Sequence, residues 1–282
     1  MEILTLEHTP LNAITDVLNQ SFADYIVPLK LTEAQLRFKI ATEDIRTDLS
    51  YGVFSSGRLV AFMLHGLRKN GSGLTAYNAA TGVIPEFRGR GLTAQMYAQL
   101  QPKLRALGVK HMVLEVIATN EPAIRAYEKE GYQKHRTLDC YAGTVKPFNG
   151  KGEYLVKELS VSGWQQLDVQ QALRPSWQNE SETIKNIGER CRILGAFNDG
   201  MPVGYIVYQP TSGKIHQLDV VPEYRRKGIA TQLFRAVCES GNRELHLYNA
   251  DRNAQGIKPF LEHMGLVCDL TQFEMGKELQ EI

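Results

Sequence analysis

The strongest constraint in this sequence is a motif that occurs twice. Residues 83–93 read Val-Ile-Pro-Glu-Phe-Arg-Gly-Arg-Gly-Leu-Thr, and residues 220–230 read Val-Val-Pro-Glu-Tyr-Arg-Arg-Lys-Gly-Ile-Ala. The Val, Pro, Glu, Arg and final Gly are identical, and the copies are offset by 137 residues. This offset is much longer than a solenoid repeat and is about the length of one domain. The sequence therefore predicts two copies of one domain.

The segments around the two motifs follow the same order along the chain. Each motif is preceded by a hairpin and a third strand, and is followed by an amphipathic helix, a buried strand and a second helix. In the second half this last helix is expected over residues 253–264, from the turn signal at its start. We predict an α/β (α+β) fold with an N-terminal domain over residues 1–145 and a C-terminal domain over residues 150–282. The join is expected near residues 144–152, where residues 146–150 have the composition of a turn.

Composition and charge exclude several other classes of protein. The 32 Lys and Arg residues nearly balance the 31 Asp and Glu residues, so the charge gives no argument for binding nucleic acid or an anionic membrane. The four cysteines are scattered without a Cys-x-x-Cys pair, which argues against a zinc site and a disulfide framework. The sequence has no basic leader and no run of about 20 apolar residues. We therefore expect a cytoplasmic protein with single buried thiols and no bound metal.

Each motif has the chemistry of an anion-binding loop. A strand leads into a loop rich in Arg and Gly, and the loop opens a helix whose first N–H groups have no partner within the helix. These N–H groups and the helix dipole favour a phosphate group. Gly91 and Gly228 leave room for a close approach and allow unusual dihedral angles. Formal positive charge comes from Arg88, Arg90, Arg225, Arg226 and Lys227.

Three alternatives compete with this interpretation. Gly89-x-Gly91-x-x-Ala94 fits a dinucleotide-binding fingerprint. That fingerprint normally follows the first strand of its domain, whereas about 80 residues precede this one, and the second copy has Arg226 in place of Gly89. A nucleotide P-loop requires a Gly-Lys-Ser/Thr sequence, which does not follow either loop. An ordinary strand–turn–helix with solvated basic residues would explain one copy, but two copies with matched flanking elements make it a poor account of both.

With these residues in view, the chain resembles the GNAT superfamily of N-acetyltransferases. The motif is similar to the family's acetyl-CoA loop, Arg/Gln-x-x-Gly-x-Gly/Ala. Downstream, a second family signature is matched by Leu114-Glu115-Val116, Asn120, Ala123-Ile124, Tyr127-Glu128-Lys129 and Gly131-Tyr132. The resemblance covers most of both halves. It implies in each half a mixed, mostly antiparallel central sheet with flanking helices, splayed between two central strands to admit pantetheine.

The same resemblance implies that both loops bind the diphosphate of coenzyme A, with acetyl-CoA as the acyl donor. Thr93 departs from the family pattern, whereas Ala230 fits it. The positions assigned to coenzyme A are Val83, Ile84, Arg88, Gly89, Arg90, Gly91, Leu92, Thr93 and Asn120 in the first half and Val220, Val221, Arg225, Arg226, Lys227, Gly228, Ile229 and Ala230 in the second.

Two residues of the first half match the family's proton-transfer positions. Tyr127 lies where a Tyr commonly protonates the departing thiolate, and a phenol with a pKa near 10 keeps its proton at neutral pH. Glu115 lies where the ribosomal-protein alanine N-acetyltransferases, which it resembles here, use a Glu as base. The alternatives are an aromatic side chain packed on a helix face for Tyr127 and a carboxylate that strand alternation points to solvent for Glu115.

The second half matches this signature less well. Leu261 lies at the tyrosine position, and the spacing from Asn253 is one residue longer. His246 or Tyr248 could substitute as acid or base, although a strand side chain with a structural role is the simpler interpretation of either. The N-terminal copy is therefore expected to be the catalyst and the C-terminal copy to be degenerate.

The predicted function is transfer of an acetyl group from acetyl-CoA to a primary amine of a small molecule by direct attack. The alternatives are a protein or peptide N-acetyltransferase and a non-catalytic coenzyme A sensor. Specificity is expected in the segment before each hairpin, which includes residues 21–28 in the first half and Trp164 and Trp177 in the second, where core packing is an equally plain role. The protein is expected to be a monomer or homodimer without nucleic acid or membrane partners.

Overall fold

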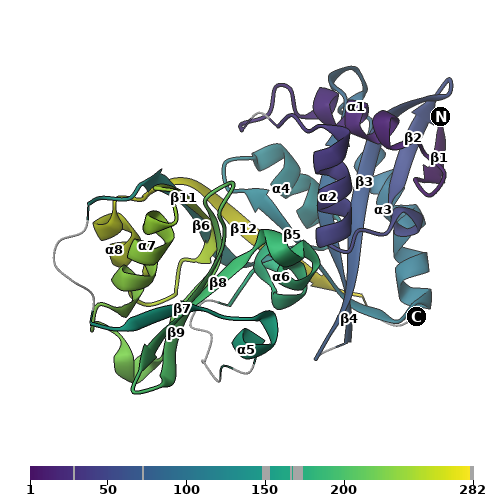
Figure 1. Cartoon of the computed structure of the whole chain (residues 1–282). Helices are drawn as coiled ribbons and strands as arrows, with labels where there is room; N and C mark the ends of the chain where they lie inside the picture. The colour runs from purple at the N-terminus through teal and green to yellow at the C-terminus, as the bar shows by residue number, and fades with distance from the viewer. Residues whose placement is uncertain (28, 72, 148–152, 166, 168–173, 280–282) are drawn as a thin grey trace. The chain divides into compact units, whose positions relative to one another are not determined.

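The chain divides into two compact units, which we describe separately. The computed structural model describes all residues except 28, 72, 148–152, 166, 168–173 and 280–282 (Figure 1). Unit 1 contains Met1–His135 and Phe273–Ile282, and unit 2 contains Arg136–Gln272. The partition differs from the predicted domain boundaries because the residues after 135 belong to unit 2 and the last residues of the chain belong to unit 1. Part of the predicted join and the predicted start of the second domain lie outside the described residues.

Unit 1 is built from strands and helices, whose ends follow from local chemistry. Thr32 and Gln35 form a capping box at the second helix, and Ser56-Gly57 form a two-residue hairpin turn with φ of 50° and 75°. The elements are β1 (Glu2–Thr5), α1 (Leu11–Ser21), α2 (Glu33–Thr42), β2 (Tyr51–Ser55), β3 (Arg58–Asn70), β4 (Gly73–Val83), α3 (Leu92–Ala106), β5 (Val109–Ile117) and α4 (Glu121–Lys129).

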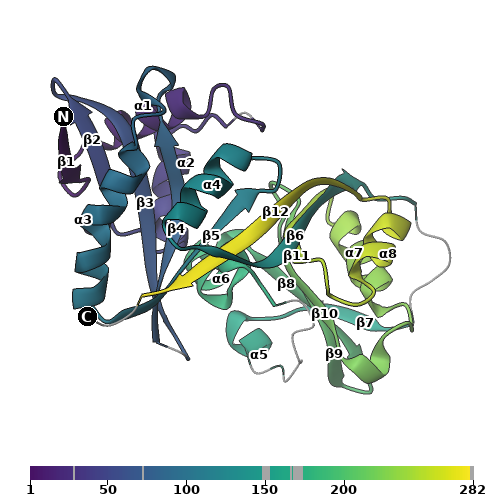
Figure 2. The same cartoon turned by 180° about the vertical axis from the view of Figure 1, so that it is seen from behind.

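The sheet of unit 1 contains a parallel pair of strands, β4 and β5. Its strand order is β1-β2-β3-β4-β5, followed by the C-terminal part of β12 (Val267–Glu278). Strands β1 to β4 pair antiparallel, whereas β4 and β5 run parallel. Figure 1 shows α1 and α2 in front of these strands, and Figure 2, seen from behind, shows α3 and α4 in front of the other face. The pairing of β4 with β5 ends at Asn78 and Leu114, so the two strands separate beyond this point.

Unit 2 repeats the order of unit 1 with shorter helices before its hairpin. The turn Asp199-Gly200 has φ of 49° and 80°, as Ser56-Gly57 has in unit 1. The elements are β6 (Gln133–Thr144), β7 (Leu155–Glu158), α5 (Val161–Gln165), α6 (Ser181–Ile187), β8 (Arg192–Asn198), β9 (Met201–Gln209), β10 (Lys214–Val220), α7 (Ile229–Glu239), β11 (Glu244–Asp251) and α8 (Ile257–Met264).

The sheet of unit 2 separates two apolar clusters. Its order is β6-β11-β10-β9-β8-β7, with β10 and β11 as the parallel pair. Side chains alternate along β9, so Tyr205 and Val207 pack with Trp164, while Ile206 and Tyr208 pack with the apolar residues of α7. Trp164 and Trp177 are both buried, which is the core role considered above.

The predicted helix over residues 253–264 is shorter in the structure. Helix α8 begins at Ile257 because Gly256, with φ of 80°, lies at its N-cap. The backbone N–H of Arg252 donates to the carbonyl of Thr137 on β6 at 3.0 Å, so this segment still belongs to the sheet. In the part of the chain that the structure describes, no helix has the length and apolar character needed to cross a membrane.

Candidate functional site

In unit 1 the Arg/Gly loop forms an open cradle at the start of a helix. Gly89 and Gly91 have φ of 74° and 70°, in the left-handed region that favours glycine. Gly91 is the N-cap of α3 and, having no side chain, makes no side-chain cap to the first turn of this helix. The first N–H groups of α3 are therefore left for an external acceptor, and the helix dipole favours an anion there.

In unit 2 the loop has the same backbone geometry. Arg226 and Gly228 have φ of 63° and 81°, and Gly228 is the N-cap of α7, again without a side-chain cap. The offset of 137 residues relates Gly89 to Arg226 and Gly91 to Gly228. The equivalence of the two motifs, inferred from sequence, therefore extends to their backbone conformation.

The first arginine of each loop is engaged by the protein itself. The Nε of Arg88 donates to the carbonyl of Val83 at 3.1 Å, and the Nε of Arg225 donates to that of Val220 at 2.9 Å. Arg88 also binds both carboxylate oxygens of Asp24, at 2.6 and 2.7 Å. Each guanidinium thus connects its loop to the end of the preceding strand, and Arg88 also connects it to Asp24, in the segment after α1.

Two equivalent basic residues, Arg90 and Lys227, each lie over an aromatic ring. The guanidinium carbon of Arg90 is 4.7 Å from the ring centre of Phe87, and the Nζ of Lys227 is 4.9 Å from that of Tyr224. These contacts leave the positive charges exposed beside the cradle.

A pocket of about 440 Å³ opens at the cradle of unit 2. Its walls come from β10, from the loop before α7 and from the start of α8. Six of the residues predicted to bind coenzyme A line it, whereas Val221 and Lys227 do not; the six are Val220, Arg225, Arg226, Gly228, Ile229 and Ala230.

Three other residues of unit 1 that were predicted to bind coenzyme A have side chains engaged within the protein. Ile84 and Leu92 are buried in the apolar core, so only their backbone atoms are available to a ligand. Asn120 caps α4, because its Oδ1 accepts from the N–H of Ala123 at 3.2 Å. Its Nδ2 donates to the hydroxyl of Tyr25 at 3.0 Å, which fixes the segment after α1 beside the start of α4.

Glu115 is the first residue of β5 beyond its last paired position with β4. Tyr77 and Glu115 share a face of the sheet, because Tyr77 pairs with Val113, two residues before Glu115. The Tyr77 hydroxyl donates to the Glu115 carboxylate. Burial raises the pKa of Glu115 to about 8; the bond from Tyr77 opposes this rise, and the neighbouring carboxylates of Glu274 and Glu43 add to it.

Tyr127 approaches from the helix layer on the other face. It lies on α4 and packs against Tyr132, with ring centres 5.9 Å apart. Burial raises the pKa of Tyr127 to about 12, and a hydrogen bond with the side chain of Thr81 limits the rise. The sequence singled out Tyr127 as a candidate acid and gave no sign of its neighbour Thr81, which no motif marks. It also missed Tyr77, which could have been found from alternation along β4.

The corresponding places in unit 2 carry different side chains. Strands β10 and β11 stay paired only as far as Ile215 and Leu247, so Tyr248 has the place that Glu115 has in unit 1. The ring of His246 stacks on that of Tyr248, with centres 5.9 Å apart. Leu261 is fully buried in the core.

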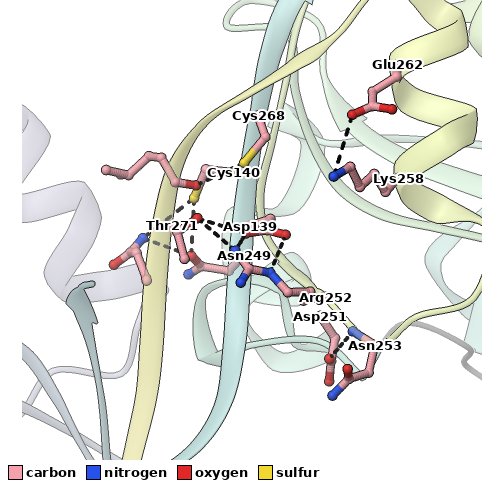
Figure 3. A network of polar contacts seen from close by, with 12 residues as sticks. Asp139, Cys140, Asn249, Asp251, Arg252, Asn253, Lys258, Glu262, Cys268 and Thr271 are labelled. Carbon is pink, nitrogen blue, oxygen red and sulfur yellow. Dashed lines mark hydrogen bonds and ion pairs between the residues drawn. The ribbon is translucent and has the colours of Figure 1, made fainter. Parts of the chain in front are cut away.

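A polar network holds the chain after β11 in unit 2 (Figure 3). The guanidinium of Arg252 binds both carboxylate oxygens of Asp139 at 2.6 and 2.9 Å and holds the pKa of that carboxyl below its usual range. The Thr271 hydroxyl donates to the same carboxylate at 2.9 Å. This bidentate pair fixes the turn that precedes α8.

Each unit thus has a glycine-capped helix start after an Arg- and Gly-containing or basic loop, and a parallel strand pair that ends beside it. Residues 13–132 and 158–265 both match the model of the acetyltransferase (GNAT) family. These segments make up most of the chain, so the chain belongs to this family. Among its described residues, no group of three or more His, Cys, Asp or Glu could hold a metal ion.

Solved structures with the same fold span almost the whole chain. A GCN5-related N-acetyltransferase from Sphaerobacter thermophilus is 17% identical with a TM-score of 0.74, covering 99% of this chain and 96% of that one. A tandem GNAT protein from the clavulanic acid biosynthesis pathway is 14% identical with a TM-score of 0.74, covering 99% and 98%. An acetyltransferase of Pectobacterium atrosepticum is 41% identical over 59 residues, which are 21% of this chain and only 40% of that protein.

Proposed function

We propose that this GNAT protein transfers an acetyl group from acetyl-CoA to a primary amine of a small molecule, and that unit 1 catalyses the transfer. The observation that carries the proposal is that Glu115 lies just beyond the last pair of β4 and β5, while Tyr127 on α4 neighbours Thr81 of β4, three residues past the same point. One residue belongs to the strand and the other to the helix layer, so a base and an acid flank the opening from different sides.

The two residues suit the two proton transfers that the reaction needs. The amine must lose a proton as its nitrogen bonds to the acetyl carbon, and the sulfur must gain one as the carbon–sulfur bond breaks. With a pKa of about 8, Glu115 has a basicity close to the working pH, where a general base is most effective. With a pKa of about 12, Tyr127 retains its proton until the thiolate forms.

Coenzyme A would be held by the cradles through its diphosphate. The uncapped N–H groups of α3 in unit 1 and of α7 in unit 2 fit a phosphate, and the exposed charges of Arg90 and Lys227 favour it. Unit 2 has a pocket at its cradle, but Tyr248 and Leu261 stand at the positions of the base and the acid. Unit 2 therefore binds coenzyme A without turnover in this proposal.

The test is release of free thiol from acetyl-CoA with a panel of small amines and a panel of peptides. We expect release with small amines, a loss of about 10²- to 10⁴-fold in Tyr127→Phe, and unchanged acetyl-CoA affinity in that variant. Acetylation restricted to peptides would show that the acceptor is a peptide or protein and not a small molecule. Binding of acetyl-CoA without thiol release from any acceptor would support the sensor function instead.

A further inference from the structure

A small cavity in unit 2 lies just beyond the last paired residues of β10 and β11. Its volume is about 20 Å³, which is room for one water molecule or one amino group. Its wall comes from the separating ends of these two strands and from the segment that precedes α6. The cavity is distinct from the larger pocket at the cradle, although Leu218 and Asp219 line both.

A β-bulge in β10 brings a histidine to the wall of this cavity. In the pairing with β9, Ile215 and Gln217 are opposite consecutive residues, so His216 between them has no partner residue. The equivalent bulge of unit 1, in β4, has Ala79 at this position. The shared fold therefore does not require the histidine.

The ring of His216 leaves one buried acceptor without a partner. Its side chain is almost fully buried, and its Nδ1 lies 3.3 Å from the carbonyl oxygen of Gln178. A carbonyl oxygen only accepts, so Nδ1 carries the proton. Burial and the charge of Lys214 hold the pKa of His216 well below its usual range, so the ring is neutral and Nε2 has a lone pair. Among the described residues, this Nε2 has no hydrogen-bond partner.

Asn179 supplies a second buried acceptor to the same cavity. Its Nδ2 donates to the carbonyl of Tyr248 at 2.7 Å, and its own carbonyl accepts from the Nε2 of Gln217 at 2.7 Å. These bonds fix the segment before α6 to both strands. The Oδ1 of Asn179 is buried and has no partner in the part of the chain that the structure describes. Buried acceptors that stay unpaired cost free energy, so a donor placed between them is favoured.

The β11 side of the cavity has a strained backbone. Asn249 lines the cavity, is buried and has a φ of 62°, in a region that costs non-glycine residues free energy. Its side chain belongs to the polar network of Figure 3, where its Oδ1 accepts from the Nε2 of Gln272 at 2.9 Å. Strain of this kind persists where the surrounding structure fixes the backbone, and it is concentrated at ligand sites.

We propose that this cavity binds the amino group of a small primary amine. Two N–H groups of the ligand donate to the Nε2 of His216 and the Oδ1 of Asn179. A primary amine has two such donors and its ammonium form has three, whereas an alcohol has one. Arg174 and Tyr248 also line the cavity and are exposed, so the rest of the ligand extends to the surface there.

The site recognises the amine without acetylating it. At neutral pH the His216 ring is too weakly basic to take a proton from an ammonium group, unlike the carboxylate of Glu115 in unit 1. The buried carboxylate of Asp219 lines the cavity, and Arg225 shares it at 3.4 Å. The inference goes beyond the proposed acetyl transfer, because binding in unit 2 needs neither acetyl-CoA nor turnover.

The direct test is ¹⁵N NMR of the full chain with labelled histidine and no acetyl-CoA. n-Butylamine should shift the Nε2 signal of His216 in a saturable way, because this nitrogen becomes an acceptor, and n-butanol should bind at least tenfold more weakly. The signal is the one that His216→Asn removes. A signal that does not respond to the amine would show that the cavity holds only water and would overturn the proposal. Equal affinity for the alcohol would overturn the ligand class.

Matched variants then test the acceptor itself. His216→Asn keeps a donor for the carbonyl of Gln178 but has no acceptor at the place of Nε2, whereas the longer amide of His216→Gln reaches that place. The backbone amides of residues 247–250, which line the cavity, report binding in every variant. We expect about tenfold weaker binding of n-butylamine in His216→Asn, recovery of most of it in His216→Gln, and no change in His8→Asn at an exposed position.

Equal binding in wild type and His216→Asn would contradict the assigned site. Thermal unfolding checks that each variant is folded, and the wild-type titration decides by itself if one is not. All of these signals come from unit 2 in the absence of acetyl-CoA, so the outcome does not depend on whether unit 1 transfers an acetyl group.

Discussion

At the residue scale, the ionisation of Glu115 connects its proposed role as a base with the free energy of folding. Its carboxyl lies at the opening between β4 and β5, where burial disfavours the ionised form and the Tyr77 hydroxyl partly compensates. The ionisation that Glu115 would need in order to act as the proposed base therefore costs folding free energy. Below its pKa of about 8 the carboxyl is neutral, which favours the folded state and would leave the proposed base unable to accept a proton.

The first prediction concerns the pH dependence of catalysis. The ratio of kcat/KM for wild type to that for Glu115→Gln should rise about tenfold per pH unit below pH 8 and level off above it, because only the carboxylate accepts a proton. The ratio removes the ionisation of the amine, which is common to both enzymes. A ratio that does not vary between pH 6 and pH 9 would exclude Glu115 as the base.

The second prediction concerns stability. The folded state binds a proton at Glu115 that the unfolded chain has already lost between about pH 4.5 and 8, so stability falls as the pH rises through this window. Glu115→Gln should therefore have a higher melting temperature than wild type at pH 9, and the difference should shrink at pH 5. Glu121→Gln on the exposed start of α4 is the control for loss of a charge. A difference independent of pH would contradict the buried, shifted carboxyl.

At the scale of elements, the two cradles have one backbone conformation and unequal sequences. Position 89 is Gly, whereas its equivalent is Arg226, and both have positive φ. A side chain in this region costs free energy that Gly does not. In unit 2, Arg226 keeps a positive charge in the wall of the pocket at the expense of this backbone strain.

The third prediction follows from this strain. Arg226→Gly should stabilise unit 2 by about 1 kcal/mol and weaken acetyl-CoA binding there, because strain and charge are removed together. Gly89→Arg should destabilise unit 1 by a similar amount. Hydrogen exchange of amides in each unit measures the two effects separately. Destabilisation by Arg226→Gly would show that the contacts of the arginine side chain stabilise unit 2 by more than its backbone strain costs.

The elements that could be predicted from sequence are those set by local rules. Periodicity and turn residues indicated the strands, hairpins and helices around each motif. The family signature singled out Tyr127 and Glu115 for proton transfer, which stays a prediction. The start of α8 was wrong, because Asn253 looks like the beginning of a helix while Arg252 is held by Asp139, more than 100 residues away. Thr81 could not be found either, since its contact with Asn78 depends on a bulge, and pairing registers are not visible in one strand.

At the scale of the whole molecule, the chain has two units of one fold with unequal chemistry. Both have a cradle with an uncapped helix start, and only unit 1 has Glu115 and Tyr127 at the separation of its parallel strands. The sequence repeat predicted two domains, but the assignment of residues 273–282 to unit 1 depends on long-range strand pairing, which the repeat does not encode.

Acetyl-CoA turnover in two matched charge reversals, Arg90→Glu and Lys227→Glu, tests the central claim most directly. These residues occupy equivalent positions, each over an aromatic ring beside its cradle, so the same change is made in each unit. We predict that Arg90→Glu raises the KM for acetyl-CoA and lowers turnover at least tenfold, while Lys227→Glu retains the turnover of wild type. Loss of turnover in Lys227→Glu with full activity in Arg90→Glu would place catalysis in unit 2 and contradict the account.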